Sequence, residues 1–431
     1  MDKQNILYQS YIRILEEELV PAMGCTEPIA VAYAAAKARD VLGAMPQSVK
    51  IGVSNNIVKN VKSVIVPNTD NMKGIAASVA AGIVAGKADK ELEVLSSVNA
   101  EEKAAMREYL ANTPISVSAV DNGVVFDIIV DVFCGSDTAS VRIAGHHTNI
   151  VLITKNGTVL HDSTAELTQQ NCGSENSADG KTDRNLLTVK DILDFADSCD
   201  IDDVNVQIRY NTLIAEEGLL GSYGANIGST RMKFYGDGVY NRAISKAAAG
   251  SDARMSGCEL PVVINSGSGN QGITVSVPVI EYAKALSVPK EKLYRALLVS
   301  NLVAIHLKTG IGTLSAYCGA VSAGCAAGGG IAYLYGEGYD GICHTLVNSL
   351  AIVSGIICDG AKPSCAAKIA SSVEAGLMGY HMFKNGQQFN AGDGIVSKGV
   401  EANIRNVGIL GSKGMRETDK EIVQIMFADQ N

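Results

Sequence analysis

The sequence contains no tryptophan, and Phe, Trp and Tyr together make up only 5% of its 431 residues. Charged residues are also few, at 19%, whereas 47% of the chain is hydrophobic. Such a chain is too apolar to be intrinsically disordered. With little aromatic material and 44 glycines, we expect an interior of closely packed helices built from small residues.

Positive charge is in the minority, because 36 Lys and Arg face 45 Asp and Glu, for a net charge of -9. This balance argues against a partner with a phosphate backbone. Residues 1–20 lack the apolar core and cleavage site of a signal peptide. The longest uncharged run, residues 309–336, is interrupted by three glycines, so we expect buried helices there and not a membrane span. We therefore predict a cytoplasmic protein without nucleic-acid or membrane partners, and leave a homo-oligomer open.

Hydrophobic periodicity predicts helices over residues 4–19 and from Pro28 onward. Residues 49–67 and 116–159 are rich in β-branched side chains and predict strands. Within or beside these strands, Asn122-Gly123 and Asn156-Gly157 are candidate hairpin turns.

The second half of the sequence changes character. Residues 161–185 are polar and predict a surface loop, and helical patterns dominate from Val189 onward. We predict an α+β fold with two domains. Residues 1–188 would form a mixed α/β domain, and residues 189–431 a mainly helical domain rich in Ala and Gly.

Cysteine is the first functional lead, because ten cysteines without a secretory signal are expected to be free thiols. Cys358 and Cys365 lie seven residues apart across a Gly and a Pro, and Cys318 precedes them. Soft thiolates around a turn suit an iron–sulfur cluster, although this spacing matches no common ferredoxin or zinc-finger pattern. Small buried structural cysteines are the alternative. The six histidines show no paired metal spacing, and we expect His146-His147 to begin a strand, with side chains on opposite faces.

A glycine-rich segment, residues 265–272, follows the apolar run 261–264. Its backbone amides and its Ser and Asn side chains suit a carboxylate or a phosphate. It lacks Gly-Lys-Ser/Thr, so it is no nucleotide-binding P-loop, and an ordinary turn is the alternative. The candidate substrate-binding residues here are Asn265, Ser266, Ser268, Gly269 and Asn270.

The short motif Gly24 to Pro28 lies between two predicted helices. Cys25 stands near a helix N-terminus, where the helix dipole is expected to lower the pKa of a thiol and favour a reactive thiolate. The alternative is an inert buried Cys25 with Thr26 as the N-cap.

Gly24 to Pro28, the segment 265–272 and the three cysteines, in that order, resemble the L-cysteine desulfidase family over essentially the whole chain. That family also carries an uncharacterised-protein label and is similar to the α-chain of iron–sulfur L-serine dehydratases. The resemblance implies a [4Fe-4S] cluster held by Cys318, Cys358 and Cys365, with the fourth iron open to substrate. The serine dehydratases space their last two ligands more widely, so this chain looks more like the desulfidase branch.

The activity implied by the resemblance is β-elimination of L-cysteine, a small amino acid, to pyruvate, ammonia and sulfide, with cluster iron as the Lewis acid. Cys25 is the first candidate for the base and Glu27 the second, and Thr26 is a candidate substrate-binding residue. Cys25 stands where the relatives have a His, so the base has to be reassigned. Three alternatives stay open: an L-serine dehydratase using the same site, a pyridoxal-phosphate β-eliminase with Lys308 as the Schiff-base lysine, and a non-catalytic protein that binds small amino acids.

Overall fold

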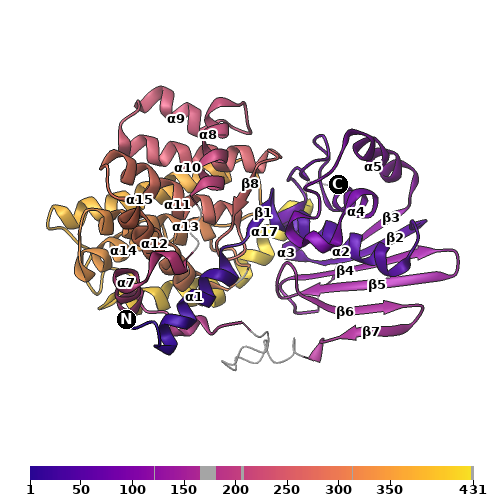
Figure 1. Ribbon diagram of the computed structural model, residues 1–431, viewed down its shortest axis with the longest axis horizontal. Coiled ribbons are helices and arrows are strands. Elements are labelled where there is room, and N and C mark those ends of the chain that lie inside the picture. Colours follow the sequence, from indigo (N-terminus) through magenta and orange to yellow (C-terminus); the bar gives the residue numbers. More distant parts are fainter. Residues whose placement is uncertain (121, 166–180, 205–207, 313, 429–431) are drawn as a thin grey trace.

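The computed structural model describes residues 1–431 except 121, 166–180, 205–207, 313 and 429–431. It has the predicted α+β fold, with a sheet in the N-terminal half and mostly helices in the C-terminal half (Figure 1). Most of the predicted polar loop 161–185 lies outside the described residues. The elements of the N-terminal half are α1 (Ile6–Glu18), β1 (Pro21–Met23), α2 (Thr26–Leu42), β2 (Ser48–Ser54), α3 (Asn55–Val61), α4 (Ile75–Ala85), η1 (Ala88–Glu93), α5 (Ala100–Asn112), β3 (Ile115–Val120), β4 (Asp127–Cys134), β5 (Asp137–Ala144), β6 (Ile150–Lys155), β7 (Thr158–Asp162) and η2 (Arg184–Leu186). Those that follow are α7 (Val189–Ser198), η3 (Ile201–Asp203), α8 (Arg209–Leu220), α9 (Ile227–Tyr235), α10 (Val239–Met255), β8 (Pro261–Val263), α11 (Gly269–Ala285), α12 (Lys290–Ile311), α13 (Gly319–Leu334), α14 (Tyr339–Val353), α15 (Cys365–Lys384), α16 (Val400–Ile409), η4 (Leu410–Gly414) and α17 (Arg416–Ala428).

The large sheet has six strands in the order β3-β2-β4-β5-β6-β7. Only β2 and β3 pair in parallel, and every other neighbouring pair is antiparallel. Asn156-Gly157 joins β6 to β7, as predicted for a hairpin turn. The prediction of a hairpin at Asn122-Gly123 is wrong, because β2 lies between β3 and β4. In Figure 1, α2, α4 and α5 lie on one side of this sheet.

The segment 49–67 is only partly a strand, which corrects the sequence-based prediction. β2 ends at Ser54, and α3 begins at Asn55. Ile57 and Val61 are both buried, and their spacing of four residues belongs to a helix. The short helix places Asn60 beside the motif that begins α2.

The helical half owes its tight packing to small residues. α13 and α15 cross where Gly324 and Gly328 face Gly376, and a Cβ atom at Gly328 would lie 2.5 Å from the backbone oxygen of Gly376. The long uncharged run 309–336 contributes buried α13 to this core, as predicted. No helix in the described part of the chain is long and apolar enough to cross a bilayer.

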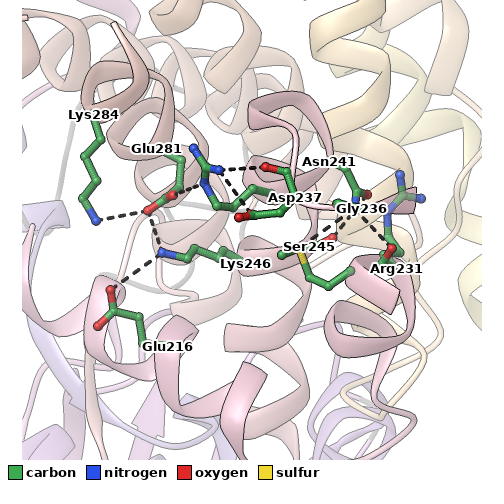
Figure 2. A network of polar contacts seen from close by, with 11 residues as sticks. Glu216, Arg231, Gly236, Asp237, Asn241, Ser245, Lys246, Glu281 and Lys284 are labelled. Carbon is green, nitrogen blue, oxygen red and sulfur yellow. Dashed lines mark hydrogen bonds and ion pairs between the residues drawn. The ribbon is translucent and has the colours of Figure 1, made fainter. Parts of the chain in front are cut away.

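A buried carboxylate joins α10 to α11. Glu281 is 2% exposed and accepts hydrogen bonds from Arg242 at 3.0 Å, from Lys246 at 2.9 Å and from Lys284 at 3.1 Å (Figure 2). Burial alone would raise the pKa of Glu281, but the hydrogen bonds from Lys246 and Lys284 hold it below its ordinary value. This network fixes the two helices whose ends meet at the candidate site.

The two halves of the chain share packing at their junction. β1 pairs antiparallel with β8, so that Pro21 faces Val263. Ala253 of α10 and Ile273 of α11 belong to the same apolar core as Ile29 of α2 and the strands of the large sheet. The start of α2, the end of α10 and the start of α11 therefore meet in one place.

Candidate active site

A small cavity of about 110 Å³, here called the inner cavity, lies where these elements meet. Both halves of the chain contribute to its wall. The predicted site residues that line it are Cys25, Glu27, Ser266, Ser268, Asn270, Cys318, Cys358 and Cys365. Segments that are hundreds of residues apart in the sequence are thus brought together around one space.

Three further predicted residues, Thr26, Asn265 and Gly269, are buried beside the inner cavity without lining it. The Thr26 hydroxyl donates to the backbone oxygen of Gly267 at 3.0 Å, which ties the start of α2 to the glycine-rich loop. The Asn265 side chain donates to Asn301 Oδ1 at 3.0 Å. Thr26 and Asn265 thus hold the loop in position, whereas Gly269 packs against the side chain of Arg254.

The three predicted cluster cysteines come from the starts of α13 and α15 and from the loop that joins α14 to α15. Cys318 is the N-cap of α13, and Cys365 is the first residue of α15. The backbone N–H of Cys318 donates to Ile356 O at 3.2 Å, and that of Cys358 donates to Ala316 O at 2.6 Å. These two bonds align the segments that carry Cys318 and Cys358. The close packing of α13 on α15 brings Cys365 to the same cavity.

The thiols influence one another and two nearby lysines. Burial, together with Cys358 and Cys365, raises the pKa of Cys318, and burial also raises that of Cys365. Burial lowers the pKa of Lys308 to about 8, against the opposing effect of Cys358 and Cys318. Burial alone would lower the pKa of Lys368, but its hydrogen bond to Asp359, with smaller contributions from Cys318 and Cys365, raises it.

The other cysteines that the structure describes are also unpaired thiols. The nine cysteines in the described part of the chain are all free, as expected for thiols. Among the residues that the structure describes, no group of three or more His, Cys, Asp or Glu side chains is arranged to hold a metal ion.

Lys308, the candidate Schiff-base lysine, also lines the inner cavity, where its amine donates to Gly312 O.

Cys25 differs from the prediction. It is the N-cap of α2, but burial, followed by the neighbouring Glu27 carboxylate, raises the pKa of its thiol well above the ordinary value, although Arg254 opposes this. The expectation of a lowered pKa is wrong, because 2% exposure removes the water that would solvate a thiolate. Cys25 instead donates to Glu27 Oε2 at 3.2 Å. Glu27 Oε1 accepts from Asn60 at 3.1 Å, so the carboxylate is held from both sides.

The glycine-rich loop ends in the start of α11. Ser266 and Gly267 both have positive φ, of 49° and 75°, which folds the chain sharply before the helix. The first helical bond runs from Gly272 N to Ser268 O at 3.0 Å. The N–H groups of the preceding residues are therefore free of the helical ladder, and Ser268 provides no side-chain cap. A helix N-terminus of this kind suits an anion.

The residues of the inner cavity that were missed from the sequence include Arg254 and His147. Arg254, near the end of α10, is 2% exposed, and its Nε has no hydrogen-bond partner. His147 does not begin a strand as predicted, since β6 starts only at Ile150. It lies in the β5–β6 connection with its ring 4.8 Å from that of Phe126. Burial lowers the pKa of His147 to about 4, so the imidazole is neutral at pH 7. The available signal for Arg254 was an Arg at the end of the Ala-rich run 247–254.

A second cavity of about 260 Å³, the outer cavity, adjoins the first. The two share four lining residues, which are His147, Ser266, Gly267 and Lys308. On its other side the outer cavity is lined by Arg184, which pairs with Glu17 and with Glu18. The outer cavity therefore lies directly beside the candidate site.

Comparisons with known proteins show the family of this chain. A family model described as serine dehydratase alpha chain matches residues 89–424. A UPF0597 protein of Desulfitobacterium hafniense is 58% identical over 99% of this chain and 98% of its own length. A UPF0597 protein of Lachnoclostridium phytofermentans is 50% identical, over 98% of this chain and 100% of its own length. The chain belongs to the serine dehydratase alpha chain family.

Proposed function

We propose that this protein is an iron–sulfur-dependent lyase that eliminates the β-substituent of a small L-amino acid, with L-cysteine as the preferred substrate. The products would be pyruvate, ammonia and sulfide. The observation that carries the proposal is the inner cavity, where three thiols face the Glu27 carboxylate and the N-terminus of α11. Membership of a dehydratase family supports the lyase assignment.

The donor set around the cavity fits a [4Fe-4S] cluster. Cys318, Cys358 and Cys365 would hold it, because soft thiolates are the ligands that iron–sulfur clusters take. Each thiolate of a cluster binds a different iron, so the thiols need to surround a shared space and not to converge on one point. Lys308 lines the same cavity as the three thiols. When bound, such a cluster supplies a Lewis-acidic iron for the leaving group.

The chain's own residues would move the proton. Glu27 is the better base, since Cys25 is a buried thiol that already donates to it. Glu27 would take the Cα proton, the C–H electron pair would form the Cα=Cβ bond, and the β-sulfur would leave with the Cβ–S pair. The resulting aminoacrylate tautomerises to an imine, which water hydrolyses to pyruvate and ammonia. The segment Ser266 to Gln271 would hold the substrate so that Cα–H points at Glu27.

L-Serine is the second candidate substrate, favoured by the description of the matching family. The same residues would act, and water would leave in place of sulfide. The short spacing from Cys358 to Cys365 supports cysteine, because the resemblance associates this spacing with desulfidases.

The test is anaerobic reconstitution with iron and sulfide, followed by iron analysis, a visible spectrum and assays with L-cysteine and L-serine. We expect about four irons per chain, a broad brown absorbance and sulfide released together with pyruvate. Turnover of serine alone would change the substrate and keep the mechanism. A sharp aldimine band would favour pyridoxal phosphate on Lys308.

A matched pair of variants makes the test specific. Cys358→Ser should lose iron and activity, whereas Cys343→Ser, a half-buried thiol of α14 outside the inner cavity, should keep both. No iron and no turnover in the wild-type protein would refute the lyase and leave the amino-acid-binding protein.

A further inference from the structure

Arg254 carries a buried positive charge that the rest of the described chain does not neutralise. Its side chain lines the inner cavity at 2% exposure, Nε has no hydrogen-bond partner, and the guanidinium forms no ion pair with any described residue. Burying an unpaired charge costs several kcal/mol, so such groups are normally matched by an opposite charge. An anion that enters the inner cavity would supply the missing partner.

The loop is shaped around this guanidinium. A Cβ atom at Gly269 would lie 2.4 Å from Arg254 Nε, so only glycine lets the start of α11 approach so closely. The free N–H groups at the start of α11 and the guanidinium therefore face the same small space. Together they provide a planar fork and a helix N-terminus, both of which suit a carboxylate.

Unpartnered acceptors stand beside the unpartnered cation. Asn270 Oδ1 and Gln271 Oε1 are buried without hydrogen-bond partners, and both residues line the inner cavity. A carboxylate alone would leave these oxygens unsatisfied, because it brings no donor. A ligand that carries both a carboxylate and an ammonium group would satisfy all of these groups.

We propose that Arg254 binds the α-carboxylate of a small α-amino acid, and that the side-chain oxygens of Asn270 and Gln271 accept hydrogen bonds from its α-ammonium group. The identity of the ligand as an amino acid rests on the proposed function, whereas the carboxylate assignment rests on Arg254 itself. The cavity volume of about 110 Å³ limits the ligand to a small side chain.

Calorimetric binding to the reconstituted protein under anaerobic conditions tests this with probes that lack a leaving group. The probes are L-alanine, L-alaninamide, which lacks the carboxylate charge, and pyruvate, which lacks the ammonium. The variants are Arg254→Met, Arg254→Lys and, as a control at an exposed arginine of α16 outside the inner cavity, Arg405→Met. Circular dichroism and thermal melting establish that each variant is folded.

We expect Arg254→Met to weaken binding of L-alanine and pyruvate about 10- to 100-fold and to leave L-alaninamide unchanged. Arg254→Lys should be intermediate, because lysine keeps the charge but not the fork. Arg405→Met should bind all three probes like the wild type. Undiminished L-alanine affinity in Arg254→Met, or no binding of L-alanine and pyruvate to the wild type, would overturn the proposal.

The same proteins separate this proposal from the proposed function. If the probes behave as expected but neither L-cysteine nor L-serine is turned over, the result supports carboxylate binding by Arg254 and refutes the proposed lyase function. If Arg254→Met turns over substrate with an unchanged KM, the result supports the lyase function and refutes carboxylate binding by Arg254.

Discussion

The crossing of α13 and α15 offers a test in which two adjacent glycines should behave in opposite ways. A Cβ atom at Gly328 would lie 2.5 Å from Gly376 O, 2.7 Å from Gly376 C and 2.8 Å from Gly376 Cα, all of them backbone atoms. At Gly329 the nearest atoms would be side-chain carbons of Leu346 at 3.4 Å and Ile342 at 3.6 Å, which is ordinary contact. Gly328→Ala must therefore push the two helices apart, whereas Gly329→Ala need not.

Both substitutions gain the same helix propensity, about 1 kcal/mol for Gly to Ala within a helix. Only Gly328→Ala also incurs overpacking, at about 1–3 kcal/mol. The free energies of unfolding of the two variants should therefore differ by about 1–3 kcal/mol, with Gly328→Ala the less stable. Because Cys318 and Cys365 stand at the starts of these helices, Gly328→Ala should also bind less iron after reconstitution.

The assay is urea denaturation followed by circular dichroism on wild type and both variants without iron, which keeps cluster binding out of the comparison. Gly329→Ala should be at least as stable as the wild type. Equal stabilities for the two variants would refute the reasoning, since it would mean that backbone contact does not set the distance between α13 and α15.

Three further predictions concern buried charge and the base. Glu281→Gln should lower the free energy of unfolding by about 2–4 kcal/mol at pH 7, whereas removing its half-exposed partner in Lys284→Met should cost under about 1 kcal/mol. The folded-state pKa of Glu281 lies below the ordinary value of 4.5. The stability lost in Glu281→Gln relative to the wild type should therefore shrink as the pH falls below 4.5, which denaturation at a series of pH values would show. In the unfolded state His147 is protonated below its ordinary pKa of 6.5, whereas in the folded state it is protonated only below about pH 4. Between pH 6.5 and 4 the free energy of unfolding of the wild type should therefore fall by up to about 3 kcal/mol more than that of His147→Gln. Glu27→Gln should lower kcat about 10²- to 10⁴-fold with unchanged iron content, and equal activity would remove Glu27 as the base.

Local patterns predicted the parts of the fold that are decided locally. Helical periodicity located the small-residue helices, and the two-residue turn at Asn156-Gly157 joins strands that are neighbours in sequence and in the sheet. The Asn122-Gly123 prediction failed because β2, from far earlier in the chain, occupies the place between β3 and β4. No turn signal contains that information.

The residues of the candidate site also differ in whether local sequence or contacts between distant segments determine their role. Ser268 could be selected from the sequence because a segment rich in Gly, Ser and Asn suggests an anion site, whereas Glu27 was selected through the family resemblance. Arg254 could not be selected, because its proposed role depends on the contact between the end of α10 and Gly269 of α11, which only the folded chain shows. The pKa of Cys25 was predicted in the wrong direction because a helix N-terminus is visible in sequence, whereas complete burial by other elements is not.

The distribution of charge around the inner cavity bears on why the site should favour elimination over mere binding. Lys308 lines the inner cavity together with the proposed cluster ligands, and Arg254 lies against Gly269 at the start of α11. A small zwitterion bound by its carboxylate at Arg254 would direct its β-substituent away from that guanidinium. Its α-carbon would then lie between the loop and the carboxylate of Glu27, which Cys25 and Asn60 hold from both sides. A fixed carboxylate and a fixed base together restrict which C–H bond can be broken, and this restriction is the contribution that the protein, as distinct from any bound iron, would make to the reaction.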